Sequence, residues 1–75
     1  MSTSPASFVL CIDNGGYPAS LEPRKVYQAL SDPVSESRGL LRVIDESGED
    51  YLYLARLFVP IQVPQEAERV FAGAP

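Results

Sequence analysis

Two residue types that often carry chemistry are missing from this chain, and a third is nearly missing. Its 75 residues contain no histidine, no tryptophan and a single cysteine, Cys11. Without histidine the chain lacks the commonest general base and the commonest metal ligand. One cysteine can form neither an intrachain disulfide nor a structural zinc site. The glycine-rich patterns that cradle phosphates are also absent. We therefore expect a protein that is not an enzyme and that holds no metal or organic cofactor.

Charge and hydrophobicity restrict the partners and the compartment. The formal net charge is −4, which repels phosphate backbones and anionic membranes. The longest apolar runs, at 8–12 and 51–55, are far shorter than the ~20 residues that span a bilayer. Residues 1–7 contain no basic residue and no apolar segment of a secretory signal. We expect a cytoplasmic protein that does not associate with a membrane and for which nucleic acid is a less favoured partner than protein.

The clearest local signal is a β-hairpin. Two apolar runs, at 40–44 and 51–54, flank an acidic segment that contains Gly48. Glycine can take the left-handed conformation that closes a short turn. Residues 55–57 are too few for an α-helix and fit one 3₁₀ turn between this hairpin and the next strand.

The remaining apolar runs complete a small all-β domain. Pro60 cannot donate a ladder hydrogen bond, so the last strand has to lie at a sheet edge or a bend. Beyond it, Ala67, Val70 and Phe71 fall on one face at helical spacing. Glu66 and Glu68 would complement the dipole of this short helix, which would need Phe71 to dock elsewhere. The predicted order is a disordered tail (1–7), a strand (8–12), a long loop (13–24), a strand (25–30), an exposed loop (31–39), the hairpin with its 3₁₀ turn, a strand (58–63) and a C-terminal extension (64–75).

This order of elements resembles the small Src-homology-3-like (SH3-like) barrel. The resemblance covers residues 8–63, and its most informative part is YLYLARLFVPI, a strand, one turn and a strand. It implies a five-stranded, mostly antiparallel barrel. The groove for proline-rich peptides in that family depends on stacked aromatics that include a tryptophan, which this chain lacks. The stretches CIDNGGYPASLE, KVYQAL, GLLRVIDESGEDYLY and FVPI are also similar to a group of short bacterial proteins without an assigned activity. That second resemblance implies a bacterial cytosolic protein of unknown role.

Alternation along the strands gives an expected core. Tyr51 and Tyr53 share one face of their strand, and Leu52 and Leu54 share the other. We expect the leucines to point inward and leave two roles open for the tyrosines, packing or contact with a partner. The expected core is Phe8 or Val9, Leu10, Val26, Leu30, Leu41, Val43, Leu52, Leu54 and Val59.

Cys11 and the acidic hairpin turn are the remaining candidates for chemistry. Cys11 has no residue beside it that activates a thiolate, so we interpret it as an inert core residue. The acidic side chains of the turn lack the spacing of a calcium loop. We interpret them as a solvated tip that discourages edge-to-edge association. These side chains are Asp45, Glu46, Glu49 and Asp50.

Tyr17 is the strongest candidate for a contact residue. It follows two glycines in a loop where no strand pattern requires an aromatic, and it either anchors a partner or folds back to plug the barrel. In an SH3-like barrel the two long loops and the 3₁₀ turn gather on one side, and the tight hairpin points away. That resemblance places a partner-binding surface on Asp13, Tyr17, Glu22, Asp32 and Arg56.

We therefore expect a non-catalytic interaction module that binds a protein or peptide partner bearing Lys or Arg. A second copy of the chain is left open as a partner. The alternative is an accessory role in nucleic-acid processes, because SH3-like barrels occur in transcription and translation factors. That role would depend on the basic residues Arg24, Lys25, Arg38 and Arg42.

Overall fold

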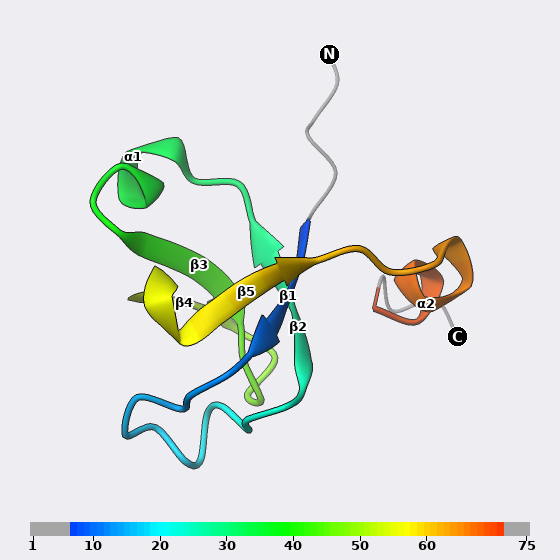
Figure 1. Ribbon diagram of the computed structural model, residues 1–75, viewed down its shortest axis with the longest axis horizontal. Helices are drawn as coiled ribbons and strands as arrows, with labels where there is room; N and C mark the ends of the chain where they lie inside the picture. The colour runs from blue at the N-terminus through cyan, green and yellow to red at the C-terminus, as the bar shows by residue number, and fades with distance from the viewer. Residues whose placement is uncertain (1–6, 72–75) are drawn as a thin grey trace.

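Five short strands form one antiparallel sheet, accompanied by a helical turn and a short C-terminal helix. The computed structural model describes residues 7–71, and the strands lie in the order β4-β3-β2-β1-β5 (Figure 1). The five-stranded all-β fold expected from the sequence is confirmed. In chain order the elements are β1 (Ser7–Cys11), β2 (Val26–Leu30), α1 (Pro33–Glu36), β3 (Leu40–Ile44), β4 (Asp50–Leu54), the 3₁₀ turn η1 (Ala55–Leu57), β5 (Phe58–Ile61) and α2 (Gln65–Phe71).

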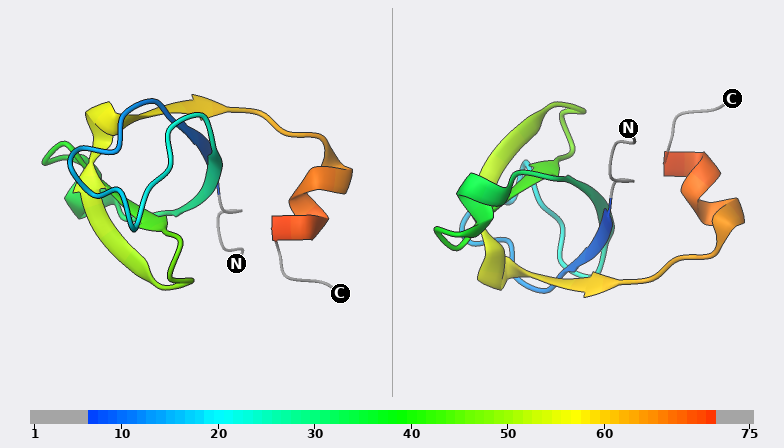
Figure 2. Two further views of the ribbon diagram at one scale, coloured as in Figure 1. Left: turned by 90° about the horizontal axis from the view of Figure 1, so that it is seen from below. Right: turned by 90° about the horizontal axis from the view of Figure 1, so that it is seen from above.

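The sheet is curved but not closed (Figure 2). β4 and β5 are its two outer strands, and within residues 7–71 no ladder joins them. Pro60 lies in β5 opposite Val9 of β1, so the edge position predicted from this proline is confirmed. The predicted 3₁₀ turn is confirmed as well, because η1 leads directly from β4 into β5.

The β3–β4 hairpin is the connection that the sequence indicated most clearly, and it is confirmed. Gly48 has a φ of +84°, the left-handed conformation expected of it. Its N–H donates a 3.0 Å hydrogen bond to the carbonyl oxygen of Asp45, and the N–H of Asp45 donates to the carbonyl oxygen of Glu49 at 3.1 Å. These bonds fix the register of the two strands.

The register of this hairpin decides which face of β4 points into the core. Val43 pairs with Tyr51, and Leu41 pairs with Tyr53. Cross-strand partners point to the same face of a sheet. Val43 is completely buried, so the tyrosine face of β4 is the inner face. The expectation that Leu52 belongs to the core is therefore wrong.

The core has aromatic side chains where aliphatic ones were expected. Leu54 and Val59 are exposed, and each is next in sequence to a buried aromatic, Tyr53 or Phe58. Both core expectations are wrong, because β4 and β5 turn their aromatic faces inward. Of the other expected residues, Phe8, Val9 and Val43 are buried, and Leu10, Val26, Leu30 and Leu41 are half-buried. The buried cluster comprises Val9, Cys11, Leu21, Tyr27, Ala29, Val43, Tyr53, Leu57 and Phe58.

The long loop after β1 is tied down at both of its ends. Ile12 N donates to the carbonyl oxygen of Leu57 at 2.8 Å, and Arg24 N donates to that of Cys11 at 2.7 Å. Gly15 has a φ of +61°, and a Cβ on it would lie 2.7 Å from Cδ1 of Leu57. Both the backbone conformation and the close approach of Leu57 require glycine at this position. The loop therefore has a defined path across one end of the sheet (Figure 2).

The second loop is largely exposed, as expected at 31–39, but it contains a helical turn, α1, that was not predicted. Asp32 caps it: its Oδ1 accepts a 3.2 Å hydrogen bond from Ser35 N. In return, Asp32 N donates to Glu36 Oε2 at 3.0 Å. Pro33 occupies the start of the turn, where a missing N–H does no harm. The cap and the proline together explain why this short segment is helical.

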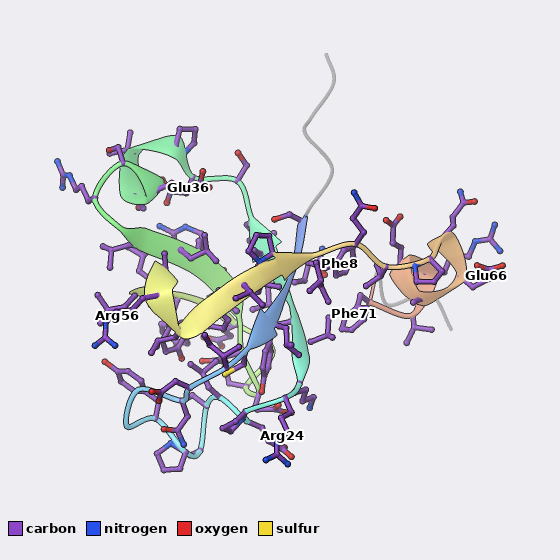
Figure 3. The ribbon with its side chains drawn as sticks, viewed as in Figure 1. Phe8, Arg24, Glu36, Arg56, Glu66 and Phe71 are labelled. Carbon is purple, nitrogen blue, oxygen red and sulfur yellow. The ribbon has the colours of Figure 1, made fainter. Side chains whose placement is uncertain are left out.

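The C-terminal helix docks through one aromatic residue. The ring of Phe71 in α2 lies 5.1 Å from the ring of Phe8 in β1, centroid to centroid, and Figure 3 shows the two side chains pointing toward each other. This contact is the docking that a helix of two turns requires. No helix within residues 7–71 is long and apolar enough to cross a membrane.

Two leucines, one buried in η1 and one exposed in β4, test this assignment of inner and outer faces. Leu57 is 1% exposed and Leu52 is 41% exposed. We expect Leu57→Ala to lower the free energy of unfolding by ~2–5 kcal/mol, because it empties a buried site. Leu52→Ala should lower it by less than about 1 kcal/mol. Urea unfolding of both variants measures the difference, and a larger loss for Leu52→Ala would contradict the inward orientation of the tyrosines.

Candidate functional site: a tyrosine groove

Three tyrosines line a groove on the surface of the described chain, which we call the tyrosine groove. It lies where the loop after β1 meets the β3–β4 hairpin, and its volume is about 390 Å³. The first loop contributes one aromatic ring and β4 contributes two. The lining residues are Tyr17, Ser20, Asp45, Ser47, Tyr51, Leu52 and Tyr53.

The three rings have different roles in the groove. Tyr53 is buried, and the ring of Tyr17 packs on it edge to face, with the centroids 5.3 Å apart. Tyr17 and Tyr51 remain 52% and 50% exposed. Tyr17 is held by its backbone as well, because its N–H donates to the carbonyl oxygen of Asn14 at 2.9 Å. The groove thus presents two half-exposed rings, and one of them, Tyr17, packs on the buried ring of Tyr53.

A buried carboxylate, Asp45, lies at one side of the groove. Its Oδ2 accepts a 2.6 Å hydrogen bond from the hydroxyl of Tyr53. Its Oδ1 accepts hydrogen bonds from the backbone N–H of Ser47 at 2.9 Å and from the Ser47 hydroxyl at 2.6 Å. Burial by itself would raise the pKa of Asp45, but the hydrogen bonds from Ser47 and Tyr53 outweigh it and lower the pKa. Asp45 therefore carries its negative charge inside the fold.

Glu46, the next residue, joins the hairpin to the end of the first loop. Its backbone N–H donates to the carbonyl oxygen of Ser20 at 3.0 Å. Its carboxylate accepts a 2.5 Å hydrogen bond from the Tyr27 hydroxyl and lies 2.7 Å from Nζ of Lys25. The bonds from Lys25 and Tyr27 lower the pKa of Glu46. Burial raises the pKa of Tyr27, and its bond to Glu46 raises it further.

Three of the residues that the sequence predicted as a binding surface lie on the first loop. Tyr17 lines the tyrosine groove. Asp13 and Glu22 are exposed and help to shape the loop: Asp13 Oδ1 accepts a 2.8 Å hydrogen bond from Gly15 N, and Glu22 N donates to the Tyr27 hydroxyl at 2.8 Å.

The other two predicted residues lie elsewhere. Asp32 caps α1, which is at the opposite end of the sheet from the first loop (Figure 1), and its Oδ2 accepts a 3.0 Å bond from Nε of Arg42. Arg56 points outward from η1 (Figure 3). The groove therefore includes only Tyr17 of the five predicted residues.

The expectation that the hairpin turn points away from the first loop is wrong. In an antiparallel β1-β2-β3-β4 series the first and third connections lie at the same end, and the second lies at the other. The hydrogen bond between Glu46 and Ser20 shows that the hairpin turn and the first loop are in contact. The four acidic side chains of the hairpin turn were expected to be solvated. Asp45 departs from this expectation, because it is buried.

Sequence reasoning missed Asp45 as a site residue and left Tyr51 and Tyr53 without an assigned role. The register of the hairpin contains the missing signal. Asp45 is two residues after Val43, so it shares a face with that residue and with the two tyrosines opposite. A buried acidic residue needs hydrogen-bond donors, and a tyrosine hydroxyl on the same face of the hairpin can supply one, as Tyr53 does for Asp45.

Cys11 and two of the four basic residues considered for nucleic acid have partners within the fold. Cys11 is fully buried, as predicted, and burial raises the pKa of its thiol. Among residues 7–71 no group of three or more His, Cys, Asp or Glu side chains could hold a metal ion. Of the basic residues considered for nucleic acid, Lys25 is ion-paired with Glu46, and Arg42 bridges two carboxylates, each with a nitrogen–oxygen distance of 3.0 Å.

Comparison with models of known protein families, with curated proteins and with solved structures gave no match.

The bond between Asp45 and Tyr53 can be tested by a double-mutant cycle. Asp45→Ala leaves a buried hydroxyl without its acceptor, which costs about 1–3 kcal/mol of unfolding free energy. Tyr53→Phe in the same chain removes the hydroxyl as well, so the double variant should be more stable than the sum of the two single losses predicts. Additive losses in urea unfolding would show that the two groups are not coupled.

The charge of Asp45 should appear in the pH dependence of stability. Its pKa is lowered by folding, so the unfolded chain binds more protons below pH ~4, the ordinary carboxyl range. Stability is therefore fully present above that pH and is lost as the pH falls through the lowered pKa of Asp45. Asp45→Asn cannot titrate, so the thermal midpoint of this variant should fall less steeply between neutral pH and pH ~3. Equal slopes for the variant and the parent chain would contradict an ionised Asp45.

Proposed function

We propose that this chain is a non-catalytic interaction module whose tyrosine groove binds a protein or peptide partner through a Lys or Arg side chain. The observation that carries the proposal is the composition of the groove. Two half-exposed tyrosine rings lie beside a buried carboxylate, and no lining residue is basic. The binding proposal depends on the groove alone and does not require the chain to belong to a particular fold family.

Rigid aromatic rings are efficient anchors for a partner. Tyrosine supplies a large contact area with few rotatable bonds, and such residues dominate many protein interfaces. Here Tyr17 is braced against Tyr53, and the hydrogen bond between Ser20 and Glu46 holds the loop to the hairpin. Little ordering is then needed on binding, which favours affinity.

The charges around the groove favour a cationic partner. Asp45 keeps a negative charge at one side of the groove, and the carboxylate of Glu49 accepts a 3.1 Å hydrogen bond from the hydroxyl of Tyr51. None of the three ion pairs formed within residues 7–71 involves Glu49. A guanidinium or ammonium group over a tyrosine face is attracted by the ring as well as by these carboxylates. The chain as a whole carries −4, which adds long-range steering of a basic partner.

The nucleic-acid alternative has less support. Lys25 and Arg42 already have carboxylate partners, so their charges would not be available to phosphates without breaking ion pairs. The acidic groove would repel a phosphate backbone.

Selection from a displayed peptide library tests the proposal. We expect the recovered peptides to be enriched in Arg and Lys, and Tyr17→Ala to weaken their binding by about 30-fold, the equivalent of ~2 kcal/mol for a central anchor. Val34→Ala, on exposed α1 at the other end of the sheet, is the matched control and should bind as the parent chain does. Glu49→Gln should mainly slow association and reduce its salt dependence. Recovery of acidic peptides, or equal binding by Tyr17→Ala, would show that the groove is not the site.

A further inference from the structure

The hydrogen bonds of the β3–β4 hairpin reveal which backbone groups of β4 are used. At the turn, Asp45 N donates to the carbonyl oxygen of Glu49 at 3.1 Å; beyond the other end of the strands, Ala55 N donates to that of Gly39 at 2.8 Å. Both pairs involve odd-numbered residues and belong to the one register of the ladder. Hydrogen-bonded pairs recur at every second residue of an antiparallel ladder. The odd-numbered residues of β4 therefore direct their backbone groups to β3.

The even-numbered residues of β4 direct their N–H and C=O groups away from β3. These residues are Asp50, Leu52 and Leu54, and within residues 7–71 no strand pairs with β4 on that side. We call this row of backbone groups the outer edge of β4. The side chain of Leu52 points to the outer face of the sheet, yet Leu52 is one of the residues that line the tyrosine groove. The groove therefore extends to the outer edge of β4.

The two edges of the sheet are not equivalent. β5 carries Pro60, a residue that blunts an edge because it cannot donate to a further strand. Residues 51–54 of β4 contain neither proline nor a charged side chain, and Leu52 and Leu54 are exposed there. The edge of β4 is therefore the one able to accept an additional strand.

We propose that the partner is a basic peptide that adds to the outer edge of β4 as an extended, antiparallel strand. This inference rests on the proposed function and specifies the mode of binding. Backbone hydrogen bonds to Leu52 would hold the peptide, and alternate side chains would enter the tyrosine groove. Strand addition and side-chain pockets are combined in this way in peptide recognition by sheet edges.

The geometry of the added strand determines which peptide fits. The peptide residue opposite Leu52 forms the hydrogen-bonded pair, so its side chain lies on the outer face with the exposed leucines. Its two neighbours lie opposite Tyr51 and Tyr53, on the face of the groove, where the carboxylates of Asp45 and Glu49 favour a positive charge. The edge therefore selects the pattern basic–apolar–basic.

A second copy of the chain fits the same edge less well. Each copy carries a net charge of −4, and pairing β4 with β4 would bring two acidic hairpins and two acidic grooves together. A basic peptide meets the same edge with complementary charge.

Substitution of Leu52 separates edge binding from groove binding. Leu52→Pro removes one outward N–H without removing a bond to β3, and Leu52→Ala is the matched control that keeps it. The probe is a fluorescently labelled peptide Gly-Ser-Arg-Val-Arg-Ser-Gly. We expect Leu52→Pro to weaken binding by about 3- to 10-fold relative to Leu52→Ala, the loss of one backbone hydrogen bond. Equal binding by the two variants would overturn the edge proposal.

N-methylated peptides keep the test decisive if Leu52→Pro fails to fold. Methylating the valine N–H, which faces Leu52, should weaken binding to the parent chain by about 3- to 10-fold. Methylating the N–H of the arginine that follows the valine should not weaken binding, because this N–H points away from β4.

Binding that depends on Tyr17 but is insensitive to both methyl groups overturns the edge proposal and leaves the proposed function intact. If the unmodified peptide does not bind at all, both proposals fail. If the parent chain dimerises in sedimentation and Leu52→Pro does not, the edge takes a second copy and the peptide proposal is wrong.

Discussion

The hydrogen bond between the Tyr53 hydroxyl and Asp45, 2.6 Å long and buried, is the interaction on which the rest of this structure depends. It combines a large apolar ring in the core with a carboxylate that the fold must satisfy. A buried charge without donors would be costly, so the Tyr53 ring has to point inward and the hairpin turn has to close over it. The orientation of β4 follows, and with it the outward position of Leu52.

The same interaction creates the surface that we propose as functional. With Tyr53 as a base, Tyr17 has an aromatic ring to pack on, and the first loop lies against the hairpin turn instead of extending into solvent. The groove thus results from the same hydrogen bond that satisfies the buried carboxylate of Asp45. Its negative charge has the same origin, because the hydrogen bonds that stabilise Asp45 keep it ionised. A site built on core contacts is rigid, which suits a binding role.

The open sheet connects this site to the proposed partner strand. Closure of the sheet would have paired β4 and used the backbone groups that now face outward at Leu52. The two edge strands differ in how well they are protected against pairing with a further strand. Pro60 protects β5, because it cannot donate a hydrogen bond. At the edge of β4 the charged residue is Asp50, which forms a 3.0 Å ion pair with Arg42. Fold and proposed function therefore meet at one strand, with the groove on its inner face and free backbone groups along its edge.

Much of the fold could be predicted from local sequence. Gly48 indicated the hairpin, Pro60 the edge strand, and Phe71 the docked helix, because turn geometry, a missing N–H and an amphipathic spacing act over a few residues. The capping pair of Asp32 and Glu36 was equally local and was overlooked. The site was harder to predict, since its residues come from segments that are far apart in the sequence.

What the sequence by itself determined is the set of strands, the turns between them and the acidic character of the chain. Only the tertiary structure decided which face of β4 is buried, because Tyr51, Tyr53 and Leu52, Leu54 alternate equally well and either pair could have filled a core. The hairpin register and the complete burial of Val43 resolved that choice. The place of Tyr17 was decided in the same way: a loop residue has no periodicity, so its position depends on the surface that the folded hairpin offers it. Because neighbouring residues of a strand point to opposite faces, a shift of one residue in the hairpin register would have turned the tyrosines of β4 outward and removed the base on which Tyr17 packs.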